Sequence, residues 1–110
     1  MIAPQIKRGS AEVAILAVLA EESLHGYEIA RRIEEQSGGV LKFTLASLYP
    51  LLYRMENLEW VRASWQTLPS GRQRRRYGLT PKGRKRLAAT VQEWGLFFRA
   101  LRRLAGVSPT

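Results

Sequence analysis

Cysteine is absent from this sequence of 110 residues, and histidine occurs once, at position 25. The absence of cysteine excludes disulfide bridges and thiolate metal sites, and His25 alone cannot form a zinc site. Long apolar runs are also missing, because the longest, residues 13–20, is bracketed by glutamates and is far short of the roughly 20 residues that a bilayer requires. No convincing secretory signal is present. We therefore expect a cytoplasmic protein that holds no metal or cofactor.

Catalytic motifs are lacking as well. The sequence contains no glycine-rich phosphate loop, no nucleophile elbow, no carboxylate pair accompanied by a histidine and no cluster of metal ligands. We interpret the chain as a non-enzyme.

Negative charge is scarce, with 9 acidic residues against 18 basic ones and a formal net charge of +9. Between Glu59 and Glu93 there is no acidic residue at all. The basic residues of this stretch are Arg62, Arg72, Arg74, Arg75, Arg76, Lys82, Arg84, Lys85 and Arg86. A run of charges is often only a solvated face, but this one has no counter-charges to reduce its self-repulsion. A polyanionic partner is therefore favoured, with nucleic acid ahead of a membrane surface.

The apolar spacing predicts three helices in the first half of the chain. The first covers residues 10–20 and is apolar on most sides, which indicates burial from more than one direction. The second covers about residues 27–36, with Tyr27, Ala30 and Ile33 on one face, and ends at Gly38 and Gly39. His25, just before it, is expected to be a cap or core residue.

The third helix is predicted to be capped by the side chain of Thr44. Its apolar residues follow the i, i+3, i+4, i+7 pattern of a buried stripe. They are Leu48, Leu51, Leu52 and Met55. Pro50 lies inside the helix, where it removes one backbone hydrogen bond.

A hairpin and a long helix complete the chain. Residues 61–67 alternate as a strand, "LPSG" is a turn, and "RQRRRYGLT" returns as a second strand with Arg74 and Arg76 on one face and Arg75 on the other. Thr80 and Pro81 then start a helix that runs to about Leu104. Three helices followed by a hairpin are typical of a winged helix-turn-helix. We expect a mainly α fold with a β-hairpin wing, in which residues 1–80 bind DNA and residues 81–110 form the dimerisation helix and tail of one compact unit.

The long helix has an apolar seam whose residues are spaced 4, 3, 4 and 3 apart, as in a helix pair. They are Leu87, Val91, Trp94, Phe98 and Leu101. This seam predicts a homodimer. Trp94 and Phe98 either pack as core or interface side chains or line a flat cavity at the interface, where a planar aromatic or cationic effector could sit.

The candidate DNA contacts lie on the third helix and the wing. Those on the helix avoid its apolar stripe: Thr44, Ser47, Tyr49, Pro50, Tyr53 and Arg54. Hydroxyls and backbone amides at a helix start commonly contact phosphates or bases, although the tyrosines could instead pack against the hairpin. In the wing they are Arg72, Arg74 and Arg75, of which Arg72 at the turn reaches furthest and could enter a narrow minor groove.

Three stretches of this sequence resemble the PadR family of bacterial transcriptional regulators. They are "LHGYEIARRIEEQSGG" at residues 24–39, "SLYPLLYRME" at residues 47–56 and "GRQRRRYGLTPKGRKRL" at residues 71–87. The resemblance implies a winged helix-turn-helix that dimerises through the C-terminal helix. It also implies a repressor function, because most members of the family are repressors that small effectors release from DNA. It also implies that Tyr49, Pro50, Tyr53 and Arg54 approach DNA and that Trp94 matches a tryptophan that lines a drug-binding cavity in similar short members.

The chain departs from the family pattern at two places. Ala46 and Ser47 stand where Gly-Thr is usual, which keeps a hydroxyl. Glu59 stands where a glycine usually follows the third helix, so the left-handed conformation expected there is more costly for this chain.

These observations predict a homodimeric, sequence-specific DNA-binding transcriptional regulator, a repressor that a small molecule releases from a pseudo-palindromic operator. Two other classes remain open. A non-specific nucleic-acid-binding or chromosome-organising protein would use the same charge, and an interaction module would present its basic face to an acidic protein. The ratio of operator affinity to random-DNA affinity separates the specific regulator from the non-specific nucleic-acid-binding protein.

Overall fold

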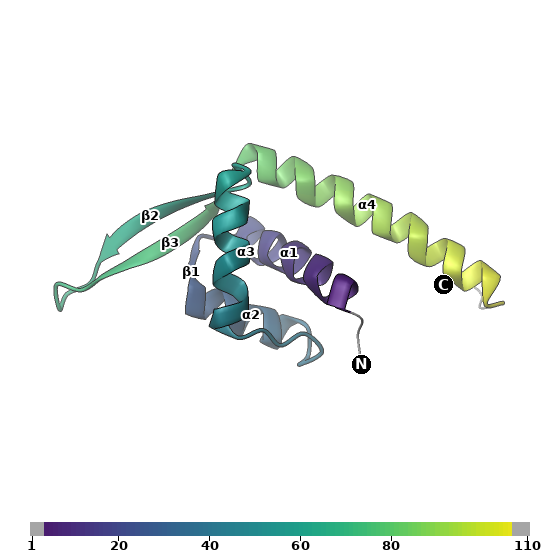
Figure 1. Ribbon diagram of the computed structural model, residues 1–110, viewed down its shortest axis with the longest axis horizontal. Coiled ribbons are helices and arrows are strands. Elements are labelled where there is room, and N and C mark those ends of the chain that lie inside the picture. Colours follow the sequence, from purple (N-terminus) through teal and green to yellow (C-terminus); the bar gives the residue numbers. More distant parts are fainter. Residues whose placement is uncertain (1–3, 107–110) are drawn as a thin grey trace.

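The computed structural model describes residues 4–106, which form four helices and a small antiparallel sheet (Figure 1). In chain order the elements are α1 Pro4–Glu21, β1 Leu24–His25, α2 Gly26–Gln36, α3 Leu45–Asn57, β2 Val61–Thr67, β3 Gln73–Leu79 and α4 Pro81–Leu104. The predicted order of three helices, a hairpin and a long helix is confirmed. The first helix is longer than expected, and β1 was not predicted.

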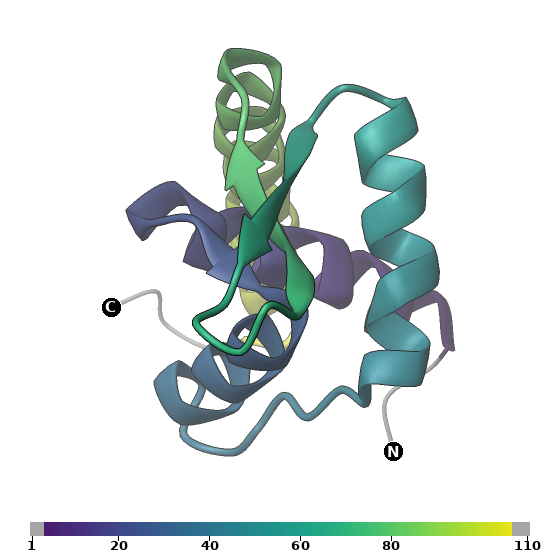
Figure 2. The same cartoon turned by 90° about the vertical axis from the view of Figure 1, so that its left-hand side faces the viewer.

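The sheet has the strand order β1-β3-β2, with both pairings antiparallel. The hairpin of β2 and β3 extends from the body of the protein as the wing (Figure 1), and α3 stands beside it (Figure 2). Gly71 has a φ of 89° in the wing turn, a conformation that glycine adopts at little cost. The short β1 pairs Leu24 with Tyr77 and His25 with Arg76, and so joins the wing to the helical body.

The predicted cap at Thr44 and the predicted helix start at Thr80 and Pro81 are both present. The hydroxyl oxygen of Thr44 accepts a hydrogen bond from the Ser47 amide at 3.1 Å, which fixes the start of α3. The hydroxyl oxygen of Thr80 accepts one from the Gly83 amide at 3.0 Å, and Pro81 occupies the first turn of α4, where its missing N–H costs nothing.

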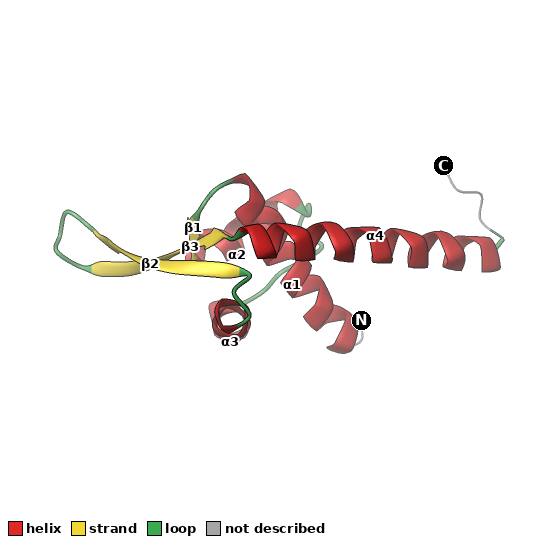
Figure 3. Ribbon diagram, turned by 90° about the horizontal axis from the view of Figure 1, so that it is seen from above, coloured by secondary structure: helices red, strands yellow, loops and turns green. Residues whose placement is uncertain are grey.

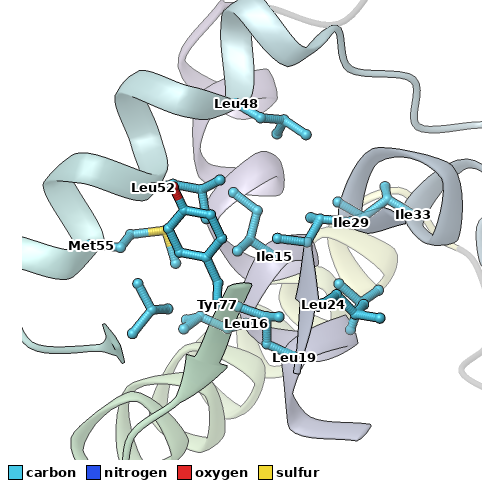
Figure 4. Packing of buried hydrophobic residues seen from close by; sticks show 12 residues of the cluster. Ile15, Leu16, Leu19, Leu24, Ile29, Ile33, Leu48, Leu52, Met55 and Tyr77 are labelled. Atoms are coloured by element: carbon cyan, nitrogen blue, oxygen red, sulfur yellow. The ribbon is translucent and has the colours of Figure 1, made fainter. Parts of the chain in front are cut away.

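The core lies where α1, α2, α3 and β3 meet (Figure 4). Leu48, Leu52 and Met55 of α3 are fully buried, as their spacing predicted, and Leu51 packs against the same cluster. Tyr77 points from β3 toward Leu52 and Met55 (Figure 4). The position of α3 is therefore set by the stripe opposite its exposed face.

Helix α1 is buried from several sides, as predicted, because it contacts α2, β3 and α4. The predicted face of α2 was wrong for Tyr27, whose surface is 67% exposed. The buried residues of α2 are Gly26, Ile29 and Ile33, at i, i+3 and i+7. The buried stripe of α2 begins with Gly26, the first residue of the helix, and continues through Ile29. Tyr27 lies beside this stripe and faces solvent.

Helix α4 leaves the body of the protein and extends away from it (Figures 1 and 3). Its start is held closely, since Gly83 is buried and Leu87 packs against the core. Beyond Thr90, large apolar side chains of α4 are exposed. No helix within residues 4–106 combines the length and the apolar character needed to cross a membrane.

Candidate nucleic-acid interface

The exposed face of α3 carries most of the residues predicted to meet DNA. Thr44, Ser47, Pro50, Tyr53 and Arg54 are all exposed. At the helix start, the Ser47 hydroxyl donates a hydrogen bond to the Thr44 carbonyl at 2.9 Å, so both hydroxyl residues take part in the cap. The N-terminus of α3 thus presents small polar groups, which fits entry into a groove.

Tyr49 is half-buried, unlike the other predicted residues of α3. Its ring stacks on Tyr53 at a centroid distance of 6.2 Å. Its hydroxyl lies against α2, because a β-carbon placed on Gly26 would be only 2.8 Å from that oxygen. Tyr49 therefore packs against the start of α2 and supports Tyr53, which remains available at the surface.

Arg54 forms an ion pair with Glu12 of α1. The Arg54 side chain is about half exposed, whereas the Glu12 side chain is mostly covered. A guanidinium has five N–H donors, so Arg54 can keep this partner and still offer donors to a phosphate.

Arg72 and Arg74 project from the wing into solvent. Neither guanidinium has an ion-pair partner among residues 4–106. With no carboxylate to offset them, they form the free positive charge of the wing tip. A phosphate backbone or a narrow minor groove attracts such a group.

Arg75 differs from its neighbours because it points toward α3. Its Nη2 atom lies 2.9 and 3.0 Å from the two carboxylate oxygens of Glu56. Arg76 points to the other face of the sheet, where its Nη1 atom is 3.5 Å from the His25 ring. The predicted alternation of the two faces is thus present, and it places Arg75 in an internal ion pair rather than at the outer surface of the wing.

His25 is buried and caps α2, as expected for a cap or core residue. Its backbone amide donates to the Glu28 carboxylate at 3.4 Å, and its Nδ1 atom lies 3.3 Å from the Arg75 carbonyl oxygen. It therefore links α2 to the strand that carries the wing arginines.

Glu56 and Trp65 are residues of this site that sequence reasoning missed. Trp65 lies opposite Arg75 in the sheet, and its ring is 5.5 Å from the Arg75 guanidinium carbon. Glu56 follows Tyr53 by three positions and so shares its face of α3. The spacing of Tyr53 and Glu56 was the only sign in the sequence that Glu56 belongs to this site. It does not identify Arg75 as the partner of Glu56, because that depends on where the wing lies relative to α3.

The predicted seam of α4 divides into two parts. Leu87 packs against the protein's own core, and Trp94 lies against α1, because a β-carbon on Gly9 would be 3.2 Å from its ring. Val91, Phe98 and Leu101 are 56%, 52% and 44% exposed. Leu96, Phe97 and Leu104 are further exposed apolar residues of α4 that the seam did not include. The Phe98 ring meets Trp94 edge-on at 6.4 Å, so the two form one aromatic patch.

Comparison with known proteins agrees with this geometry. Residues 15–89 match the model of the transcriptional regulator PadR-like family, which is more than half of the chain. The chain belongs to the PadR-like family. Its fold is a winged helix, as predicted.

Individual relatives of this PadR-like chain span a range of lengths. It is 30% identical over 94 residues to an uncharacterised protein of Lysinibacillus sphaericus, a match that covers 86% of each. It is 38% identical over 81 residues to a protein of Mycobacterium tuberculosis described as a probable transcriptional regulator, but it covers only 42% of that protein.

Two solved structures show the same fold. A PadR-like transcriptional regulator of Bacillus cereus has a TM-score of 0.78 at 26% identity, with 94% of this chain and 99% of that chain covered. PadR of Bacillus subtilis in complex with operator DNA has a TM-score of 0.67 at 22% identity, with 73% of this chain and 44% of that chain covered. The PadR-like chain is therefore a transcriptional regulator by family. The same fold occurs both in a chain that it covers almost completely and in one that it covers to less than half.

Proposed function

We propose that this protein is a homodimeric transcriptional regulator that binds specific DNA sequences, and that it acts as a repressor which a small molecule releases. The observation that carries the proposal is the pairing of an exposed α3 face with a wing tip whose Arg72 and Arg74 have no carboxylate partner among the described residues. A surface with these two elements side by side can read bases with the helix and hold the backbone with the wing. Operator binding by the Bacillus subtilis relative supports the same use of this fold.

In this proposal the start of α3 enters the major groove. Thr44 and Ser47 then contact phosphates or base edges, Pro50 and Tyr53 pack along the groove wall, and Tyr49 holds Tyr53 in place. Arg54 contacts the backbone from the far end of the exposed face. The wing places Arg72 in the adjacent minor groove, with Arg74 at its edge.

The dimer would form through α4. Val91, Phe98 and Leu101 are exposed in a row on one face of this helix, and a second copy would cover them. A twofold axis through such a helix pair puts two α3 helices on a pseudo-palindromic operator. Half-sites would lie about one helical turn, or a multiple of it, apart.

The effector would bind beside Trp94 and Phe98. These rings lie edge to face on α4, and pairing with their symmetry mates would create a flat apolar site suited to a planar aromatic or cationic molecule. Such a ligand could shift the regulator only by preferring one spacing of the two α3 helices. Binding of the planar cation proflavine tests this, because Trp94→Ala should abolish it while the thermal unfolding transition remains.

The experiment that tests the main proposal starts from a library of random-sequence duplexes. Duplexes retained by the protein through repeated selection at about 150 mM salt are sequenced, and the affinity for the selected sequence is compared with that for random duplex of equal length. A pseudo-palindromic sequence preferred by at least about a thousandfold supports a specific regulator.

The second candidate function is a non-specific coating of nucleic acid, which the net charge of +9 favours. It predicts no enriched sequence and equal affinities for every duplex. Both functions release counterions, so a steep salt dependence alone does not separate them. Failure to retain any duplex at this salt concentration would instead favour an acidic protein partner.

A further inference from the structure

We infer that Arg75 and Glu56 form a clamp that fixes the wing against α3, so that Arg75 positions the DNA-binding elements and does not itself hold a phosphate. The inference rests on the proposed function, because it concerns how the same surface recognises DNA. It also separates the three wing arginines that were predicted to contact DNA into two kinds, with Arg72 and Arg74 left for the DNA.

The clamp joins three elements through one guanidinium. Glu56 comes from α3, Arg75 from β3, and the Trp65 ring on β2 lies 5.5 Å from the guanidinium carbon. The rings of Tyr53 and Tyr77 are 5.9 and 5.8 Å from the same carbon. A planar cation held between aromatic faces and a carboxylate has little freedom to rotate. The position of β2 and β3 relative to α3 is therefore set at this point.

Neutralisation is the second effect of the clamp. The side chains of Arg75 and Glu56 are only 29% and 33% exposed, and the Nη2 atom of Arg75 faces both carboxylate oxygens of Glu56. A phosphate that bound the Nη2 atom would have to displace Glu56 and enter between the wing and α3. Arg72 and Arg74 impose no such requirement, because they are exposed at the wing tip.

Stability is a poor explanation for this arrangement. The Nε atom of Arg75 is buried without a hydrogen-bond partner among the described residues, and such a donor is costly. A half-buried ion pair often adds no more stability than apolar side chains of similar size would. What the pair provides is one defined arrangement of the two elements that must enter neighbouring grooves together.

The consequence concerns specificity more than overall affinity. A wing that can swing away from α3 still reaches the backbone of any duplex through Arg72 and Arg74. It no longer requires the groove spacing that one particular sequence offers. Loosening the clamp should therefore lower the preference for the selected operator while the binding to random duplex is retained.

The first test compares Arg75→Met with Arg74→Met, which remove one positive charge from neighbouring positions. Affinities for random duplex are measured at several salt concentrations, together with the ratio of affinities for the selected operator and random duplex. Arg74→Met should reduce the salt slope by about one per protomer, as the loss of a phosphate contact does. Arg75→Met should leave that slope unchanged and lower the ratio by about tenfold, comparable to the loss of one base contact.

Two outcomes overturn the clamp in this experiment. Equal losses of salt slope in the two variants would mean that Arg75 contacts phosphate. Unchanged slope and unchanged ratio in Arg75→Met would mean that the pair has no part in recognition. A thermal unfolding curve for each variant shows whether it is folded before its DNA affinity is interpreted.

Glu56→Gln supplies a second variant should Arg75→Met fail to fold. Its control is Glu59→Gln, which makes the same charge change three residues away, where the carboxylate is 79% exposed and lies 3.9 Å from Lys82. Glu56→Gln should lower the operator preference about tenfold, and Glu59→Gln should leave it as in the wild type. Equal effects in both variants would show that net charge, and not the clamp, is responsible.

A measurement without DNA separates failure of the clamp from failure of the proposed function. Because the chain has no cysteine, Ala46→Cys with Gln73→Cys allows spin labels at two exposed positions, one on α3 and one on the wing. Labelled protein is mixed with excess unlabelled protein, so that any dimer carries one labelled protomer. The distance distribution should broaden in Glu56→Gln but not in Glu59→Gln. An unchanged distribution overturns the clamp, whereas a broadened one without operator preference in the wild type would contradict the proposed function instead.

Discussion

Gly83 lies so close to Trp60 that a β-carbon built on it would be 2.1 Å from the Trp60 carbonyl oxygen. The same atom would be 2.7 Å from Cδ1 of Leu79. This contact sets the start of α4 against the end of the segment that joins α3 to the wing. The direction in which α4 leaves the body therefore depends on a residue with no side chain.

Gly83→Ala should destabilise the protein by about 3 kcal/mol, because the main-chain oxygen of Trp60 cannot move as a flexible side chain can. Urea unfolding followed by circular dichroism measures the change. Gly95→Ala is the matched control on the same helix, since its β-carbon would meet only Arg99 at 3.5 Å. Gly95→Ala should stabilise the protein by about 0.5 to 1 kcal/mol, because alanine has a higher helix propensity than the glycine that it replaces. Equal effects of the two substitutions would contradict the importance of the contact.

Glu59→Gly should stabilise the protein by about 1 kcal/mol. Glu59 has a φ of 64°, the left-handed conformation that the resemblance to the family led us to expect at this position, and a β-carbon makes that conformation costly. Its side chain contributes little, because its contact with Lys82 is exposed and 3.9 Å long. Glu59→Ala keeps the β-carbon and should give no gain. A gain of the same size in the alanine variant would assign the effect to the carboxylate rather than to the backbone.

The parts of the fold that depend on local sequence could be predicted. The cap at Thr44, the helix start at Thr80 and the buried stripe of α3 are each read from residues within seven positions of each other. The two-residue strand β1 is too short to show alternation, and it forms only because β3 pairs with it. Its existence is a property of the assembled sheet.

The candidate site was predictable only as a set of residues. The sequence placed Arg75 on the opposite face of the wing from Arg74 and Arg76, but could not tell which face meets α3. That depends on how the hairpin packs, which brings Glu56 within 3.0 Å of Arg75 across 19 positions of the chain. The seam of α4 shows the same limit, since its spacing cannot separate Leu87, which packs on the protein's own core, from Phe98, which is exposed.

Tyr77→Phe should stabilise the protein by about 1 kcal/mol near neutral pH, because the Tyr77 hydroxyl is buried without a hydrogen-bond partner among the described residues. Burial raises the pKa of the Tyr77 hydroxyl above its usual value, and the nearby Arg75 offsets only part of this. In the unfolded chain the group ionises near pH 10. The wild type should therefore keep its full stability below about pH 10 and lose stability relative to Tyr77→Phe above it.

Urea unfolding of wild type and Tyr77→Phe between pH 7 and pH 11 measures this difference. Tyr27→Phe is the control, because Tyr27 is 67% exposed. The difference from wild type should be close to zero for Tyr27→Phe at every pH. A loss of stability in Tyr77→Phe would mean that the hydroxyl has a partner.

Arg72→Ala with Arg74→Ala should weaken binding to every duplex and reduce the salt slope by about two per protomer, because both guanidinium groups would lose phosphate contacts. The dimer should be unaffected. Arg99→Ala with Arg103→Ala removes the same charge from exposed positions of α4 and serves as the control. Fluorescence anisotropy of labelled duplex at several salt concentrations gives the slopes. Equal slopes for wild type and the wing variant would exclude the wing tip from the interface.

Phe98→Asp should convert the proposed dimer into a monomer. Phe98 is half exposed in the single chain and lies in the same stripe of α4 as Val91 and Leu101, so a partner helix would bury it. An aspartate buried there without a partner would cost several kcal/mol in each copy, which exceeds what a short seam can supply. Gln92→Asp is the control, because residue 92 lies on the opposite side of the helix and is exposed.

Analytical ultracentrifugation should then show a dimer for the wild type and Gln92→Asp and a folded monomer for Phe98→Asp. A monomeric wild type would remove the dimer from the proposal, and a dimeric Phe98→Asp would place its interface elsewhere. The monomer should also lose operator preference, because only a dimer fixes the distance between two α3 helices.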